Sequence, residues 1–295
     1  MKAAAFAYSR PADVDEACAL LAADDGARII AGGQTLVPMM AMRLARPTRL
    51  VDIARIASLS YVRAENGGIA IGACTRQSAV ERDALVARQV PLLARAVPFI
   101  GHAATRARGT VGGSLANGDP AAELPLIALT LNAVLAYRTG GKDGEIKAQD
   151  FYLGPMTTAL PTGGCLTAVR FPVWQNERVG VGFHEVNARR SDFAFAAAAV
   201  QLALDEADNV KRIAIAIGAA TDVPLRLREA ERQLTGGMLD EKKATEALRA
   251  ALADIEPLDD LHASADYRRR AALTLAQCAI VDARSEAQGK RAHAH

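Results

Sequence analysis

Hydrophobic and polar positions alternate in different ways along the chain and divide it into three stretches. In residues 1–55 a short extended run precedes a helical pattern, which Asp13 and Glu16 introduce with the spacing of a capping box. Two apolar runs of strand length follow, at 27–31 and 49–53, with helix-like residues between them. Strand, helix and strand in this order predict a small α/β unit with parallel pairing.

Residues 56–175 mix the two patterns. The turn sequence 65–68, Glu-Asn-Gly-Gly, lies between two short apolar runs and predicts a β-hairpin. The pattern further predicts helices over 76–87, 91–97 and 121–131, and strands over 133–138 and 165–173. Between them, residues 101–125 are rich in glycine and show little periodicity, so we expect a long functional loop there.

Residues 178–287 read as a β-meander followed by helices. Alanine-rich residues 193–204 favour a helix by propensity, but the turn at 205–209 and the alternation over 210–217 favour strands on both sides. We therefore predict strands over 179–186, 193–204 and 210–217, then helices over 225–234, 240–253 and 264–287. The polar tail, 288–295, is predicted to be disordered.

Composition narrows the classes of partner. The chain has 295 residues and is 51% hydrophobic, which is ample for a core and suggests two domains. Its 35 basic and 33 acidic residues give a net charge of +2, which argues against nucleic acid as the main partner. No apolar run reaches membrane-spanning length and the N-terminus has no signal-peptide pattern, so we expect a cytoplasmic protein without a membrane partner.

The cysteines and histidines show no spacing that is typical of a metal site. Four cysteines are far apart in the sequence, and no pair forms a CxxC motif (Cys18, Cys74, Cys165 and Cys278). We therefore expect no metal in this chain, buried thiols, and a reducing compartment.

Two glycine segments carry the candidate chemistry. Gly32-Gly33 follows an apolar run and precedes a helical pattern, an arrangement that presents backbone N–H groups and a helix dipole to a phosphate. Gly112-Gly113, within the long expected loop, is flanked by the hydroxyls of Thr110 and Ser114. Most Gly-Gly pairs are simple turns, but two such segments together suggest a diphosphate held from two sides.

These segments resemble a known pattern. Residues 31–36 and 110–114 are similar to the two flavin-binding signatures of the FAD-binding medium subunit of xanthine dehydrogenase and carbon monoxide dehydrogenase-type molybdenum hydroxylases. Residues 100–102 and 117–125 have the expected flanking character, and 189–194 resemble the segment that opens the C-terminal region. The resemblance extends over residues 3–287 in the same order.

The resemblance implies an α+β fold with a two-subdomain PCMH-type FAD-binding part, at 1–55 and 56–175. A C-terminal domain of a small antiparallel sheet plus helices would follow at 178–287. It further implies an electron-transfer subunit of a heterotrimer, with FAD bound in this chain. Substrate would be oxidised at a molybdenum–pterin cofactor on a large subunit, and two [2Fe-2S] clusters of a small subunit would carry the electrons to FAD. FAD would then reduce an external acceptor, and the complex would be a dimer of heterotrimers.

The resemblance also implies which residues bind the cofactor. Residues 30–37 and 110–114 would cradle the pyrophosphate, Ile100 would lie against the ring, Glu123 would contact a polar part of FAD, and the Leu166 backbone would lie beside the ring. The complete implied set is Ile30, Ala31, Gly32, Gly33, Gln34, Thr35, Leu36, Val37, Ile100, Thr110, Val111, Gly112, Gly113, Ser114, Asp119, Glu123, Leu166, His184 and Phe193.

Three members of this set have a second interpretation. His184 falls where many relatives have a lysine near the flavin, which leaves the flavin potential open, or it is an ordinary strand histidine. Phe193 either covers the isoalloxazine edge or packs in the core. Asp119 either touches FAD or caps the loop.

Two other functions fit the same segments. A self-sufficient FAD-dependent oxidoreductase on this fold would need an acid–base residue, for which Asp119 and Glu123 are the candidates. A nucleotide-binding scaffold without turnover would need none. For an electron-transfer subunit we expect no catalytic residue, because the redox chemistry belongs to the flavin. Carbon monoxide, purines, N-heterocycles and aldehydes stay open as substrates, and NAD, oxygen, quinones and cytochromes as acceptors.

Overall fold

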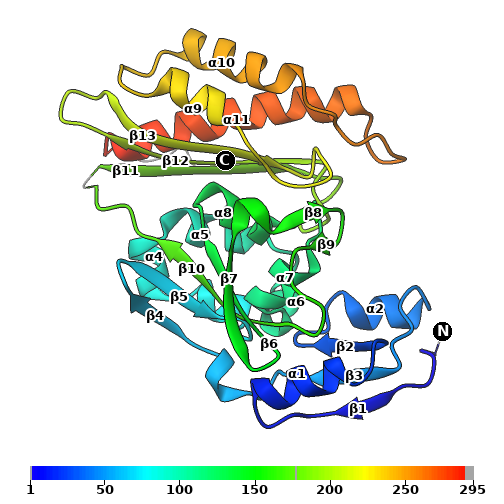
Figure 1. Cartoon of the computed structure of the whole chain (residues 1–295). Helices are drawn as coiled ribbons and strands as arrows, with labels where there is room; N and C mark the ends of the chain where they lie inside the picture. The colour runs from blue at the N-terminus through cyan, green and yellow to red at the C-terminus, as the bar shows by residue number, and fades with distance from the viewer. Residues whose placement is uncertain (1, 177, 290–295) are drawn as a thin grey trace.

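The computed structural model describes residues 2–176 and 178–289 and shows three sheets in successive layers (Figure 1). The first is a parallel sheet in the order β1-β3-β2. The layer that contains this sheet consists of β1 (Ala7–Ser9), α1 (Val14–Ala22), β2 (Ala27–Ile30), α2 (Leu36–Ala41) and β3 (Arg49–Asp52). The predicted parallel pairing is confirmed, and Asp13 accepts a hydrogen bond from the Glu16 N–H at 2.8 Å to begin α1. Glu16 in turn accepts from the N–H of Ala12, one residue before the N-cap.

The second sheet is antiparallel, in the order β4-β5-β10-β6-β7. The predicted hairpin forms at Asn66 and Gly67, whose φ angles of 48° and 76° suit a tight turn. The strands are β4 (Val62–Glu65), β5 (Gly68–Gly72), β6 (Val134–Thr139), β7 (Lys142–Lys147) and β10 (Cys165–Pro172), and a separate hairpin joins β8 (Tyr152–Gly154) to β9 (Thr157–Thr158). The helices are α3 (Gln77–Val80), α4 (Ala84–Gln89), α5 (Pro91–Ala96), α6 (Ala103–Arg108), α7 (Val111–Asn117) and α8 (Glu123–Thr130), with 3-10 turns η1 (Ala57–Leu59), η2 (Val97–Phe99) and η3 (Ala148–Asp150).

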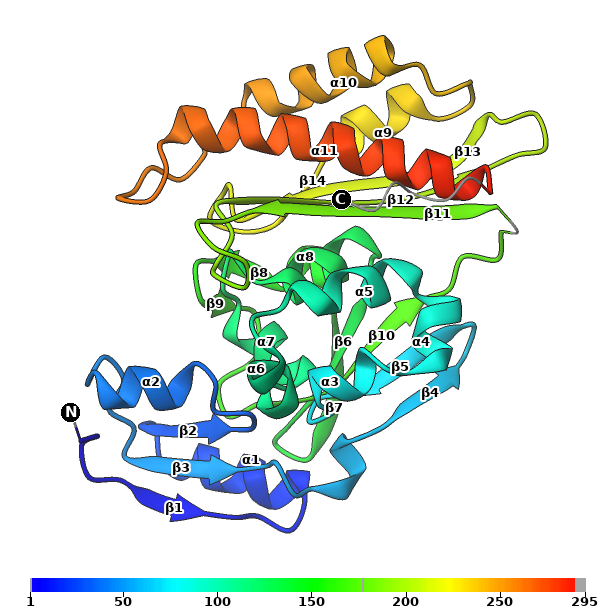
Figure 2. The same ribbon diagram turned by 180° about the vertical axis from the view of Figure 1, so that it is seen from behind.

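The third sheet is an antiparallel meander, β11-β12-β13-β14. It consists of β11 (Val179–Val186), β12 (Ala196–Leu204), β13 (Val210–Gly218) and β14 (Leu225–Arg226), and is followed by α9 (Arg228–Leu234), α10 (Glu241–Ala253) and α11 (Ala265–Ala287). Figures 1 and 2 show α9, α10 and α11 on its outer face and α5 and α8 on its inner face. The alanine-rich segment is therefore a strand, as predicted, and every residue of β12 is buried.

Small residues explain how α11 comes so close to this sheet. A Cβ on Gly180 would lie 1.9 Å from the carbonyl oxygen of Ala283, and one on Gly182 would lie 2.0 Å from that of Ala279. Close packing thus determines which face of β11 lies against α11, because only glycine, which has no Cβ, fits beneath the helix at these two positions. Val181 and Phe183, between these glycines, face the middle layer and share its core.

The structure corrects three expectations. The helix predicted over 76–87 is broken, because Asp83 accepts hydrogen bonds from the N–H groups of Leu85 and Val86 and begins α4. The long loop expected over 101–125 contains α6 and α7, and α8 begins within it at Glu123. The short elements β8, β9 and β14 were not predicted. Of the tail predicted to be disordered, residues 290–295 lie outside the described part.

One apolar core runs continuously from the second sheet through α5 and α8 to the inner face of the third sheet. The first layer instead packs on a smaller cluster in which three buried thiols gather, those of Cys18, Cys74 and Cys165. The thiol of Cys278, on α11, is exposed, so the expectation of a buried thiol is wrong there. Among the described residues no helix combines the length and the apolar character needed to cross a bilayer.

Candidate functional site

The first glycine segment, residues 32–35, joins β2 to α2. The N–H groups of Gly32, Gly33, Gln34 and Thr35 donate no hydrogen bond to any residue that the structure describes. Gly33 has a φ of +69°, a backbone conformation that favours glycine. Successive N–H groups without an acceptor form an anion-binding concavity, here at a helix start.

The two glycine segments touch each other. A Cβ on Gly32 would lie 2.5 Å from the carbonyl oxygen of Arg108 and 2.9 Å from the Cα of Gly109. One on Gly113 would lie 4.0 Å from the Cβ of Ala31. Segments about eighty residues apart in the sequence are therefore in backbone contact, which is the arrangement that a shared diphosphate requires.

The second segment does not offer the row of unused N–H groups that the sequence suggested. The N–H of Val111 donates to the Thr75 carbonyl at 3.0 Å and that of Gly112 to the Ala73 carbonyl at 2.8 Å. The N–H of Gly113 donates to Thr110 Oγ1 at 3.1 Å, which caps α7. These bonds compensate for the low helix propensity of glycine and explain why a helix forms here. Ser114, at the next position, is partly exposed.

Arg106 fixes the turn before α6, although no sequence motif singled it out. Its guanidinium donates to the carbonyls of Ile100 and Gly101 at 3.1 and 2.9 Å, and it forms a bidentate ion pair with Glu81. Ile100 is held almost completely buried, and Leu166 is buried at a register shift in β10. No local pattern distinguishes it from Arg108, two residues further on.

Three carboxyls interact electrostatically, those of Asp119 and Glu123 at the start of α8 and that of Glu185 on β11. Asp119 accepts from the N–H of Ala121 at 2.9 Å, so it caps the loop. Glu123 is half-buried, and burial, followed by the charge of Asp119, raises the pKa of its carboxyl to about 7. Sequence reasoning missed Glu185, on the same face of β11 as Phe183. Burial, followed by the charge of Glu123, raises the pKa of Glu185 to about 8, and its Oε2 is buried without a hydrogen-bond partner among the described residues.

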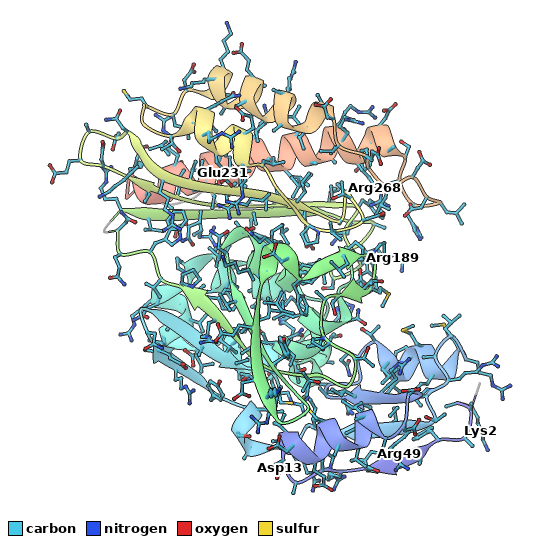
Figure 3. The ribbon with its side chains drawn as sticks, in the orientation of Figure 1. Lys2, Asp13, Arg49, Arg189, Glu231 and Arg268 are labelled. Carbon is cyan, nitrogen blue, oxygen red and sulfur yellow. The ribbon has the colours of Figure 1, made fainter. Side chains whose placement is uncertain are left out.

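The structure does not bring His184 to the glycine segments. Its Nε2 lies 2.8 Å from Oδ2 of Asp282 on α11, on the opposite face of β11 from Glu185. Phe193 lies in the β11–β12 connection with 70% of its surface exposed, so the interpretation as a core residue is wrong. Arg268 holds the end of this connection by donating to the Phe195 carbonyl at 2.6 Å. In Figure 3, the label of Arg268, on α11, lies above that of Arg189, a residue of the β11–β12 connection.

Comparisons with known proteins decide the family. The family model described as the FAD binding domain in molybdopterin dehydrogenase matches residues 4–174. The chain belongs to this family. The model of the CO dehydrogenase flavoprotein C-terminal domain matches residues 182–283. The chain is thus an FAD-binding oxidoreductase subunit of the molybdopterin dehydrogenase type, and the resemblance seen in the sequence and the expected α+β fold are confirmed.

Similar proteins cover nearly the whole chain. The medium subunit of nicotine 6-hydroxylase from Paenarthrobacter nicotinovorans is 34% identical over 96% of this chain and 99% of its own length. Among solved structures, quinoline 2-oxidoreductase from Pseudomonas putida 86 matches with a TM-score of 0.91 and 35% identity, over 98% and 99% of the two chains. Carbon monoxide dehydrogenase from Hydrogenophaga pseudoflava, in a form that lacks the Mo-pyranopterin moiety of the molybdenum cofactor, matches with a TM-score of 0.93 and 31% identity, over 97% and 99%.

The residues present fit the dinucleotide of this molybdopterin dehydrogenase flavoprotein. The N–H groups of residues 32–35 are available for a diphosphate. The contact of Gly32 with Gly109 leaves no space for a side chain at position 32, where the two segments meet. Within residues 2–176 and 178–289 no three His, Cys, Asp or Glu side chains converge as they would around a metal ion.

The carboxyls of Glu123 and Glu185 make the stability of this flavoprotein depend on pH. In the folded protein both pKa values lie above the ordinary value of 4.5, so the folded state binds more protons than the unfolded state between about pH 4.5 and about pH 8. The free energy of unfolding of the protein without FAD should therefore fall as the pH rises through this range. Replacing Glu185 by glutamine should reduce that fall by on the order of 1–3 kcal/mol, because glutamine does not ionise.

Urea unfolding at about pH 5 and about pH 9 measures this difference. Glu246→Gln, at an exposed position of α10, is the matched control and should follow the wild type. An equal pH dependence in Glu185→Gln and the wild type would show that Glu185 is ionised in the folded protein at neutral pH.

Proposed function

We propose that this chain is the electron-transfer medium subunit of a heterotrimeric molybdenum hydroxylase. Two [2Fe-2S] clusters on a small subunit would supply electrons from a molybdenum–pterin centre on a large subunit, and an external acceptor would remove them from FAD. The observation that carries the proposal is the contact between the two glycine segments beside four N–H groups without an acceptor. Relatives named as medium subunits of nicotine 6-hydroxylase and of carbon monoxide dehydrogenase support it.

Each part of the site has a separate task in this proposal. FAD, when bound, supplies reversible uptake and release of electrons. Residues 32–35 bind the diphosphate through backbone N–H groups, and the neighbouring residues 30–31 and 36–37 support the turn. Residues 110–114 hold the second segment against it, with the Ser114 hydroxyl as a donor. Arg106 keeps Ile100 in place, so that its apolar side chain excludes water from the ring.

The acidic side of the proposed site differs from the set implied by the resemblance. We keep Glu123 and Leu166 beside the cofactor, retain Asp119 as the residue that orients the loop, and add Glu185 because it faces Glu123. We assign His184 to the packing of α11 on β11. The exposed ring of Phe193 is available to cover the flavin edge.

The proposed complex is cytoplasmic and contains two copies each of a large, a medium and a small subunit. Exposed apolar side chains are consistent with subunit contacts, since Val37, Met42 and Leu44, on and just after α2, are each more than half exposed. The domain limits 1–55, 56–175 and 178–287 are likewise part of the proposal. The subunit arrangement can be measured by native mass spectrometry of the co-purified complex.

A reconstitution experiment tests the proposed function. The purified chain with FAD should show flavin absorption and stay oxidised when a small substrate is added alone. The flavin should bleach only when the large and small subunits are present with their substrate. A folded chain that stays colourless in excess FAD would contradict the proposal.

Bleaching by substrate without partners would favour the self-sufficient oxidoreductase. One observation gives that alternative a basis, because Glu123 and Glu185 hold protons near neutral pH and could serve as acid–base groups. The same experiment carried out with Glu185→Gln separates the two functions: an electron-transfer subunit should still be reduced through its partners, whereas a self-sufficient enzyme that uses this group should not be reduced by substrate.

A further inference from the structure

A second candidate site lies in the C-terminal layer, away from the glycine segments. A cleft of about 470 Å³ opens between the beginning of β13 and α9. Four cationic side chains line it, those of Lys211, Arg212, Arg228 and Arg232, together with one carboxylate, that of Glu231. In Figure 3, Glu231 marks its position on α9. A cleft with this lining concentrates positive potential.

The carboxylates near the cleft do not neutralise these cations. Glu231 forms a bidentate ion pair with Arg226, and its Oε1 also accepts from the N–H of Ile215 at 2.8 Å. Arg232 is paired with the exposed Glu229. Lys211, Arg212 and Arg228 have no carboxylate partner among the residues that the structure describes. Three positive charges therefore lie in one cleft without an ion-pair partner among the described residues, and the charge of Glu231 acts on Arg212 only at longer range.

Two of these cations are held in place by uncharged groups. The guanidinium carbon of Arg212 lies 3.9 Å from the centre of the buried Trp174 ring, a cation–π geometry. Arg228 donates to Oδ1 of Asn132 at 3.3 Å and to Oε1 of Gln149 at 3.1 Å. Both side chains are thus preorganised without losing their charge, which reduces the conformational entropy lost when an anion binds.

The like charges are close enough to affect one another. Burial, followed by the charge of Arg226, lowers the pKa of Arg212 from its ordinary value. Burial also lowers the pKa of Arg226, and the charge of Arg228 adds to this effect. The self-repulsion of this group would be relieved by a bound anion.

The open edge of β13 adds a backbone donor. The N–H of Ile215 donates to Glu231, and its carbonyl accepts from the N–H of Leu227 at 2.8 Å, so both point away from β12. Residues two apart in a strand point the same way, so the N–H of Ile213 also faces this edge, and no described residue accepts from it. Ile213 lines the cleft.

We propose that this cleft binds a phosphate dianion, either inorganic phosphate or the phosphomonoester of a small molecule. Arginine forks match the oxygens of a phosphate group, and charge-assisted hydrogen bonds of this kind are about twice as strong as neutral ones. Because Arg228 is anchored on Asn132 and Gln149 of the middle layer, an anion here also ties the C-terminal layer to it. None of the residues that we propose to bind FAD lines this cleft.

Binding can be measured on the FAD-loaded full chain, so that the N–H groups of residues 32–35 are already occupied. Titration with inorganic phosphate, followed by ³¹P NMR line width and by thermal unfolding, should saturate, and a parallel titration with AMP distinguishes free phosphate from a phosphomonoester. The double substitution Lys211→Gln and Arg212→Gln should weaken binding by at least about tenfold while the flavin spectrum stays unchanged.

Arg249→Gln removes one exposed charge from α10, outside the cleft, and should bind phosphate as the wild type does. The double variant also removes the contact between Arg212 and Trp174. The single substitution Arg228→Gln keeps that contact and should also weaken phosphate binding. Absence of saturation with both anions, or equal affinity in Arg228→Gln, the double variant and the wild type, would overturn the proposal.

Discussion

Replacing Gly32 by valine should leave the protein folded but colourless. The added Cβ would lie 2.5 Å from the Arg108 carbonyl oxygen and 2.9 Å from the Gly109 Cα. Both neighbours are backbone atoms, so the contact is relieved only if the two glycine segments move apart. Because the proposed diphosphate site lies between them, we expect FAD affinity to fall by at least about 100-fold. The ratio of flavin absorption to protein after purification, and titration of the apoprotein with FAD, measure this change.

A glycine outside the two segments serves as a control. A Cβ on Gly154 meets no atom within 4 Å, so Gly154→Ala should bind FAD as the wild type does. A Cβ on Gly112, within the second segment, would lie 2.4 Å from that of Ala73, so Gly112→Ala should displace α7 and lower both the free energy of unfolding and FAD affinity. A Gly32→Val protein with wild-type circular dichroism and wild-type FAD affinity would disprove the shared diphosphate site.

Local chemistry was enough to predict much of the fold. The hairpin at Asn66-Gly67 and the start of α1 at Asp13 depend on residues within a few positions of one another. The strand β12 was predicted against alanine's helix propensity, because the turn at 205–209 and the alternation that follows it favour a meander. The first glycine segment was found for the same reason, since a strand, two glycines and a helix start are local features.

Long-range contacts explain what was missed. Residues 111–113 form a helix because their N–H groups bond to Thr110 and to residues 73–75, which no local pattern shows. The sequence predicted the strand β11, but not which of its faces lies against the middle layer. That choice depends on Gly180 and Gly182, which lie beneath α11. His184 was selected through the family resemblance and lies on the α11 side, whereas Glu185, on the inward face, was not selected. Arg106 depends on Glu81, twenty-five residues away, and gave no signal.

Replacing Arg226 by methionine should cause a large loss of stability. Arg226 extends from β14 to the end of α8, where its Nη1 donates to the Thr130 carbonyl at 2.7 Å and the Leu129 carbonyl at 3.3 Å. It also forms a bidentate ion pair with Glu231, and the two side chains are only 8% and 11% exposed. Methionine would leave the buried carboxylate of Glu231 with only the Ile215 N–H as donor, and would leave the Thr130 carbonyl without a donor among the described residues. We expect the free energy of unfolding to fall by about 3–5 kcal/mol, measured by urea denaturation.

A second ion pair, on the helix that carries Glu231, serves as a control for the effect of burial. Arg232 and Glu229 also form an ion pair, but their side chains are 70% and 50% exposed, so Arg232→Met should leave the urea midpoint unchanged. Adding Glu231→Gln to Arg226→Met should recover part of the loss, because the buried charge is then removed as well. Equal midpoints for Arg226→Met and Arg232→Met would show that the shared apolar core and the other polar contacts, such as those of Arg228 with Asn132 and Gln149, hold the middle and C-terminal layers together without Arg226. The expected difference instead makes Arg226 a polar connection that stabilises the packing of the third sheet on α8.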